Sequence, residues 1–210
     1  MSKRITTLIL AVSLFLQVFV ITSCNRRYDE DEVIEATKVL LKNAEKLNFI
    51  YYGEGLKYQE DENAKGYYRK ADKTHLDELG FHTIDELKSL TEATFSDDYS
   101  GILYSNFLNA LMSNGTLVSA TRYYQAYDEK TGQATDIMVH SKYEPMMNST
   151  ITYDYDSISV EKSKKKKVYA TVDATVTDKD GNSKKVKITI TLIEEDDGWK
   201  IDNPVYANYI

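Results

Sequence analysis

The second half of the chain alternates between apolar and polar residues, and this pattern limits the possible fold more than any other feature. Between residues 168 and 177, valine and alanine alternate with tyrosine, threonine and aspartate, and between 186 and 192 aliphatic residues alternate with lysine and threonine. Successive side chains of a β-strand point to opposite faces, so both segments are predicted strands with one buried and one solvated face. The sequence DKDGN between them predicts an antiparallel hairpin.

More strands are predicted on both sides of this hairpin. They cover residues 117–127, 134–140 and 150–161, and a short last strand begins at Trp199. The alternation changes phase near Asp156, which is typical of a β-bulge. Asp173 is out of step with the buried valines, so we expect its carboxylate to face solvent.

The first half of the chain has helical spacing instead. Apolar residues recur every three or four positions from Val33 to Leu47, which predicts an amphipathic helix. Asp29 or Asp31 is its expected cap, and Gly53 its expected end.

Two shorter helices are expected next. Thr83 and Glu86 have the spacing of a capping box. A third helix is predicted from Asp97 to Met112, with Ser96 as its cap. The intervening residues 56–82 are mixed, and only GYYRKAD indicates a short strand.

Helices followed by consecutive antiparallel strands predict an α+β fold, in which N-terminal helices pack on one face of a curved antiparallel sheet. This arrangement resembles the NTF2-like and cystatin-like folds, and the ending GWKIDNPVY resembles their closing strand. We expect one such domain over residues 33–210.

The N-terminus predicts export. Lys3 and Arg4 precede an apolar run over residues 8–21 that is short for a membrane span, and the small residues Thr22 and Ser23 follow. Residues 1–23 are therefore a predicted signal peptide. The sequence ITSC resembles a bacterial lipobox, which implies cleavage before Cys24 and a diacylglyceryl group on its thiol. The alternative is an ordinary signal peptide or an uncleaved anchor, with Cys24 incidental.

A lipid on Cys24 would hold the protein at the outer face of the cytoplasmic membrane. Two acyl chains give stable anchoring, whereas one holds only marginally. Residues 24–32 would form the lipidated tether. The formal charge is −7, and losing Lys3 and Arg4 with the signal peptide leaves the mature chain near −9. This acidity is unfavourable for binding nucleic acid.

The sequence predicts no catalytic residue, no metal site and no cofactor. Its three histidines lie in separate regions, and the common nucleophile, phosphate-loop and zinc-protease motifs do not occur. The acidic pairs at 97–98 and 196–197 fit a helix start and a turn. The lysine-rich run at residues 162–167 fits a solvated hairpin turn, or contact with an anionic wall polymer or lipid headgroups.

Tyrosine is unusually frequent, with 17 residues against 6 phenylalanines. Several are adjacent, including Tyr67–Tyr68 and Tyr123–Tyr124. Neighbouring strand residues face opposite sides, so one tyrosine of each pair should be at least partly exposed. Such tyrosines fit a recognition surface, or the ordinary β-sheet preference of the residue.

The segment from Lys65 to Phe107, with its GYYRKAD and TFSDDY sequences, resembles the IseA-type inhibitors of cell-wall DL-endopeptidases and related NTF2-like lipoproteins of Gram-positive bacteria. This resemblance implies a non-enzymatic protein that binds a peptidoglycan hydrolase and blocks its substrate groove. The partner-binding residues expected on that basis are Tyr67, Tyr68, Asp97, Asp98 and Tyr99.

Two alternatives stay open. A ligand-binding lipoprotein would have a large apolar cavity between the first helix and the sheet. An enzyme resembling NTF2-like isomerases would bury Asp154, Asp156 or Asp173 beside a tyrosine hydroxyl. The expected exposure of Asp173 weakens the enzyme alternative.

Overall fold

The computed structural model describes residues 28–61, 66–109, 111–113, 116–119, 121–147, 149–164 and 167–205. The predicted signal peptide, Cys24 and residues 165–166 of the lysine-rich run lie outside these ranges. Within the ranges, no helix combines the length and the apolar character that a membrane span requires.

Helices fill most of the first half of the chain, with one short strand between the first two, and the remaining strands follow, as the sequence pattern predicts. The helices are α2 (Glu30–Tyr51), α3 (Lys73–Leu79), α4 (Ile84–Glu92) and α5 (Asp97–Phe107). The strands are β1 (Tyr68–Lys70), β2 (Leu111–Ser113), β3 (Thr116–Ser119), β4 (Tyr123–Tyr127), β5 (Ala134–His140), β6 (Ser149–Lys164), β7 (Lys167–Asp178), β8 (Ser183–Glu195) and β9 (Gly198–Ile201). The α+β class is confirmed, whereas the NTF2-like subtype stays a prediction.

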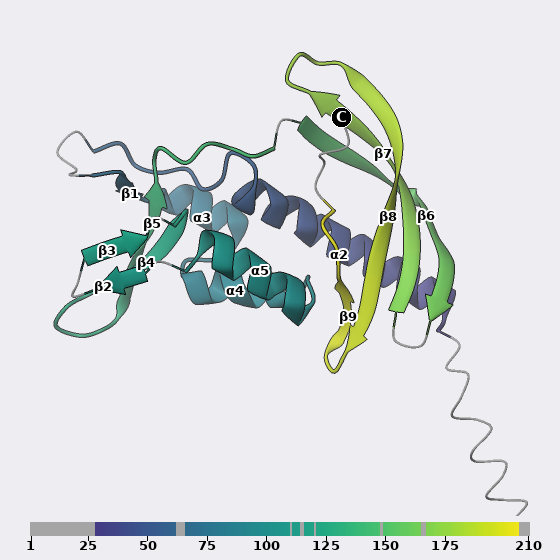
Figure 1. The fold of residues 1–210 in the computed structure, drawn as a ribbon, viewed down its shortest axis with the longest axis horizontal. Helices are drawn as coiled ribbons and strands as arrows, with labels where there is room; N and C mark the ends of the chain where they lie inside the picture. The colour runs from purple at the N-terminus through teal and green to yellow at the C-terminus, as the bar shows by residue number, and fades with distance from the viewer. Residues whose placement is uncertain are drawn as a thin grey trace, which may run out of the picture.

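The curved sheet β6-β7-β8-β9 is antiparallel throughout and packs against α2 (Figure 1). The alternation in β7 places Val168, Ala170, Val172, Ala174 and Val176 inside, as predicted. The predicted bulge is also present, because the register of β6 against β7 shifts between Asp154 and Ser159. Asp173 is exposed.

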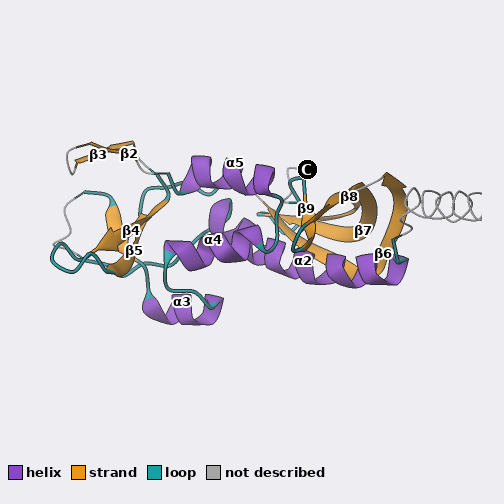
Figure 2. Ribbon diagram, turned by 90° about the horizontal axis from the view of Figure 1, so that it is seen from below, coloured by secondary structure: helices purple, strands orange, loops and turns teal. Residues whose placement is uncertain are grey.

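Helix α2 begins directly after Asp29, one of the two caps predicted for it. Asp29 is the cap, and its carboxylate accepts hydrogen bonds from the backbone nitrogens of Asp31 and Glu32. Helix α2 therefore begins inside the segment 24–32 that was predicted as a tether. In Figure 2 it extends from the curved sheet towards a second, smaller sheet at the other end of the molecule.

The strands do not form one sheet. Strands β1, β5 and β4 form the smaller antiparallel sheet, and β2 and β3 form a separate hairpin. The predicted strand 117–127 is therefore split in two. Helix α5 ends at Phe107 rather than Met112, because the Thr121 hydroxyl donates to the Phe107 carbonyl at 2.6 Å and the chain turns into β2.

The capping box of α4 is confirmed, but helix α3 was not predicted. Thr83 and Glu86 exchange both capping hydrogen bonds. In α3, Asp72 caps the start and Gly80 ends the helix in the left-handed conformation. These two signals were present in the sequence, but seven residues are too few to show a helical period.

His75 in α3 joins this helix to the chain that follows α2. Its side chain is buried, with 8 % of the residue exposed. The Nδ1 atom of His75 accepts a hydrogen bond of 2.9 Å from the backbone nitrogen of Lys57. Only an unprotonated Nδ1 can accept this bond, and burial lowers the pKa of His75 below its usual value of 6.5.

We predict that acid weakens the fold through His75. The unfolded chain takes up a proton near pH 6.5, while the folded chain resists it, so the free energy of unfolding should fall as the pH decreases below about 6.5. Urea denaturation at neutral and mildly acidic pH measures this. In His75→Gln that part of the pH dependence should disappear, and in His82→Gln, whose imidazole is exposed, it should stay. An identical pH profile for the wild type and His75→Gln would contradict the prediction.

Candidate functional site

A groove of about 630 Å³ lies between α5, the loop after β5 and the segment that follows β9. Its lining combines aromatic and aliphatic side chains with a few acids and amides. These residues are Tyr52, Asp98, Tyr99, Ile102, Asn106, Phe107, Tyr143, Met146, Asp202, Asn203 and Pro204. We treat this groove as the candidate functional site.

The floor of the groove consists of buried rings. The hydroxyls of Tyr52 and Tyr99 lie 3.3 Å apart, and the ring of Phe107 packs edge-on against Tyr52 at 5.0 Å. Ile102 and Met146 rise above this floor with 53 % and 54 % of their surfaces exposed. The groove therefore offers apolar surface to solvent above a rigid base.

One carbonyl holds the loop after β5 against α2. The backbone oxygen of Tyr52 accepts hydrogen bonds from the nitrogens of Met146 at 2.7 Å and Met147 at 2.9 Å. Tyr52 thus contributes its ring to the floor and its carbonyl to the wall.

The opposite wall is fixed by Asp202. Its two carboxylate oxygens bind the Ser96 hydroxyl at 2.8 Å and the Lys167 ammonium at 2.9 Å. The backbone also links this wall to α5, because the nitrogen of Ser96 donates to the carbonyl of Ile201 at 2.9 Å. Both walls of the groove are therefore held in place by bonds within the protein itself.

Arg122 supports the groove from below. Its guanidinium is buried and donates to the carbonyls of Tyr51 and Gly53, both at 2.6 Å. The same guanidinium lies 4.7 Å from the centre of the Tyr143 ring. These bonds place a positive charge at the negative end of α2 and position one wall tyrosine of the groove.

Tyr123 completes this support. Its hydroxyl donates to the carbonyl of Ile50 at 2.7 Å and accepts from the nitrogen of Leu56 at 3.1 Å. Burial raises the pKa of Tyr123 to about 12, so the phenol keeps its proton at neutral pH. Gly55 lies directly against both side chains, and its φ is +79°.

The structure separates the two predicted aspartates. Asp98 lines the groove together with Tyr99. Asp97 instead lines a neighbouring acidic depression whose other residues are Glu92 and the turn at residues 194–197. The backbone nitrogen of Asp97 donates to Glu195 Oε1 at 3.1 Å.

Tyr67 and Tyr68 lie away from the groove, in and beside strand β1 of the smaller sheet. Tyr67 is 60 % exposed, and its ring stacks on His140 at 5.6 Å. Tyr68 is half-buried, and its hydroxyl donates to the carbonyl of Thr121 at 2.6 Å. The prediction that one tyrosine of each adjacent strand pair is at least partly exposed holds, because Tyr67 is exposed and Tyr124 is partly exposed. Tyr67 and Tyr68 do not join Asp98 and Tyr99 in one site.

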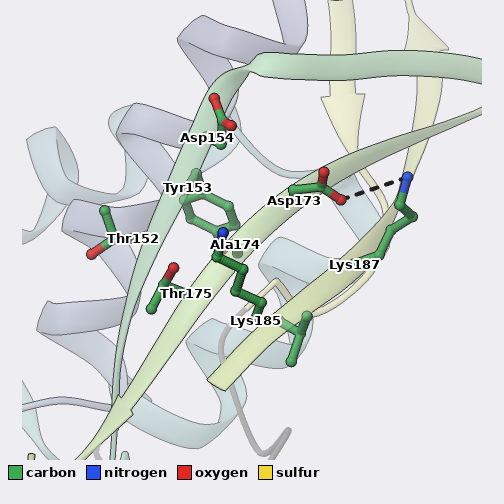
Figure 3. A pocket seen from close by; sticks show the side chains of 9 residues that line it. Thr152, Tyr153, Asp154, Asp173, Ala174, Thr175, Lys185 and Lys187 are labelled. Atoms are coloured by element: carbon green, nitrogen blue, oxygen red, sulfur yellow. Dashed lines mark ion pairs between the residues drawn. The ribbon is translucent and has the colours of Figure 1, made fainter. Parts of the chain in front are cut away.

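The arrangement expected of an isomerase-like enzyme is not found at its three proposed carboxylates. Asp154, Asp156 and Asp173 are all exposed. Figure 3 shows Asp154 and Asp173 at an open cavity of about 390 Å³ on strands β6–β8, where Asp173 pairs with Lys187 at 3.5 Å. Tyr153, drawn beside them, donates its hydroxyl to the carbonyl of Val205. None of these three carboxylates is the buried base that the enzyme alternative requires, and the predicted exposure of Asp173 is confirmed.

The space between α2 and the curved sheet is occupied by the protein's own core. Leu41, Leu47, Val172 and Ile188 are buried there in one contiguous cluster. The groove on α5 is a different place from the cavity that the ligand-binding alternative expected. Among the described residues, no three histidines, cysteines or acids come together as a metal site.

Several groove residues were missed from the sequence. Ile102, which is half exposed, and Tyr143 and Met146 were not singled out, and neither was Arg122, which supports the groove without lining it. The available signal for Arg122 was its position immediately before two tyrosines in the sequence. Its contacts with the end of α2 span about 70 residues, so sequence spacing could not show them.

No protein-family model matches this chain, and no curated protein was found to match its sequence. The resemblance to the IseA-type inhibitors therefore rests on the sequence patterns described above.

We predict that Gly55→Ala weakens the fold strongly. A Cβ at this position would lie 2.3 Å from Arg122 Nη2 and from the Tyr123 hydroxyl. Gly80 has the same φ of +79° with no atom within 4 Å, so Gly80→Ala carries the backbone cost alone. That cost is about 1–2 kcal/mol, and Gly55→Ala should lose clearly more free energy of unfolding in urea. Equal losses in the two variants would contradict the packing described for Arg122.

Proposed function

We propose that this chain is an exported, lipid-anchored protein that binds a partner protein through the groove on α5 and carries out no chemistry itself. The observation that carries the proposal is the preformed groove itself, with buried tyrosines as its floor and exposed Ile102 and Met146 above them. Aromatic residues and methionine are enriched at protein interfaces. Rigid walls reduce the entropy lost on binding.

The proposed partner class comes from the resemblance to IseA-type inhibitors. A peptidoglycan hydrolase of the DL-endopeptidase kind would dock a protruding segment in the groove, and its substrate cleft would then be covered. Asp98 and Tyr99, two of the residues expected from the resemblance, lie in the groove, which supports this choice.

A second candidate function is the binding of a small ligand in the same groove. Its volume of about 630 Å³ is within the range of small-molecule sites, roughly 300–1,000 Å³. Such a ligand would leave hydrolase activity unchanged.

The test is a hydrolysis assay. The full chain, purified in non-ionic detergent, is added to a DL-endopeptidase at increasing ratios, and the release of peptides from cell walls is followed. The proposal expects activity to fall in proportion to the added chain and to reach its minimum near equimolar ratio. Undiminished activity at a large excess, with no complex in a binding assay, would refute the inhibitor function.

We predict that Ile102→Ser weakens the inhibition at least several-fold without lowering the free energy of unfolding, because Ile102 is half exposed on the groove. Val39→Ser is the matched control, since Val39 is a β-branched residue on a helix with 60 % exposure and does not line the groove. Equal inhibition by both variants would place the binding surface elsewhere.

We also predict that Cys24 carries the membrane anchor. Cells grown with labelled palmitate should label the wild-type chain, and Cys24→Ser should be unlabelled and should leave the membrane fraction. Labelling of the serine variant would contradict a lipid at this residue. Under this proposal the tether restricts inhibition to hydrolases that work close to the membrane.

A further inference from the structure

We infer that the groove on α5 recognises a basic side chain, with an arginine of the partner segment as the best fit. This inference rests on the proposed function, since it names the chemistry of the partner at the same site. It is carried by the charge of the groove and by the order of side chains along α5.

Among the described residues, the groove lining contains acids but no basic residue. Asp98 and Asp202 are its two carboxylates, and none of the described lining residues is a lysine, arginine or histidine. Asp202 is already bound by Lys167 and Ser96. The Asp98 side chain is exposed and makes no ion pair or hydrogen bond with the described part of the chain. One carboxylate at the groove is therefore available to an incoming cation.

The surroundings strengthen the negative potential at this end of the groove. The start of α5 contributes about half a positive charge, which the two carboxylates of Asp97 and Asp98 outweigh. On the far side of Asp97 lies the acidic depression with Glu92 and residues 194–197, where the buried Lys200 pairs with Asp197 at 2.8 Å. The remaining carboxylates attract cations and repel anionic groups.

The order of side chains along α5 matches an amphipathic basic residue. Asp98, Ile102 and Asn106 are spaced by four positions, so they form one ridge along the groove. The exposed Ile102 can support the methylene stem of an arginine or lysine while the charged head reaches Asp98. Met146 borders the same groove and adds apolar surface to the contact.

The carboxylate of Asp98 favours arginine over lysine. Asp98 presents two carboxylate oxygens at the groove, whereas the buried hydroxyls of Tyr52 and Tyr99 are bonded to each other and Asn106 lies two helical turns further along α5. A guanidinium carries five N–H donors in a fixed plane and can bind a carboxylate through two of them. The carboxylates of the groove would repel an anionic wall peptide. Under the proposed function, the matching cation is therefore a basic side chain of the hydrolase itself.

A peptide pair tests the inference directly. The probes are a blocked pentapeptide, Gly-Leu-Arg-Leu-Gly, and the same peptide with citrulline, a neutral isostere of arginine. The full chain in non-ionic detergent carries labelled methionine methyl groups, and the Met146 signal is assigned with Met146→Leu. The arginine peptide should shift the Met146 signal and bind about three- to fivefold more tightly than the citrulline peptide, in line with an exposed ion pair.

Two neighbouring aspartates supply matched variants. Asp98→Asn should remove the preference for arginine over citrulline, while Asp97→Asn, one residue away in the acidic depression, should keep most of it. Equal affinity of the two peptides for the wild type, the absence of any Met146 shift at millimolar peptide, or an unchanged preference in Asp98→Asn would each overturn the inference.

The outcomes separate this inference from the proposed function. Hydrolase inhibition that is lost in Ile102→Ser but unchanged in Asp98→Asn would overturn the basic anchor and leave the inhibitor function intact. Arginine binding that depends on Asp98, without inhibition of any hydrolase, would support the anchor and remove the inhibitor function.

Discussion

Burying the Arg122 guanidinium would be costly if its charge had no partners, and the fold supplies them from several directions. Two carbonyls at the end of α2 accept its hydrogen bonds, and the rings of Tyr123 and Tyr143 lie within 5.4 Å and 4.7 Å of it. No carboxylate pairs with Arg122 in the described ranges. The negative end of the helix dipole therefore contributes to balancing its charge.

The contacts of Arg122 join parts of the molecule that lie far apart in the sequence. Arg122 directly precedes β4 in the smaller sheet, whereas α2 reaches the curved sheet at its other end (Figure 1). Tyr143 then positions one wall of the groove, and the Tyr52 carbonyl fixes the loop beside it. The end of α2 therefore holds the wall of the groove that the loop after β5 forms, while Asp202 fixes the opposite wall.

The sequence predicted features that depend on neighbouring residues. The capping box at Thr83 and Glu86, the caps at Asp29 and Ser96 and the alternation in β7 all follow from local geometry. The bulge near Asp156 could be found because it changes the phase of a regular pattern.

Features that depend on distant contacts were not predictable in this way. Helix α5 ends early because Thr121, fourteen residues later, binds the Phe107 carbonyl. Asp97 and Asp98 are equivalent as a sequence pair, yet they separate because consecutive helical residues point about 100° apart and the turn between β8 and β9 lies beside Asp97. The groove itself is formed by three segments whose approach no spacing rule describes.

The edge contact between Tyr28 and Trp199, with ring centres 4.8 Å apart, has a geometric consequence for a protein attached at Cys24. The four residues from Cys24 to Tyr28 span at most about 14 Å. A lipid on Cys24 would therefore hold the start of β9 close to the bilayer. The acidic turn at residues 194–197 directly precedes β9, so anionic lipids near the anchor would repel it. Anchor and repulsion would then act in opposite directions on the same end of the domain, and the smaller sheet would extend outward from the membrane.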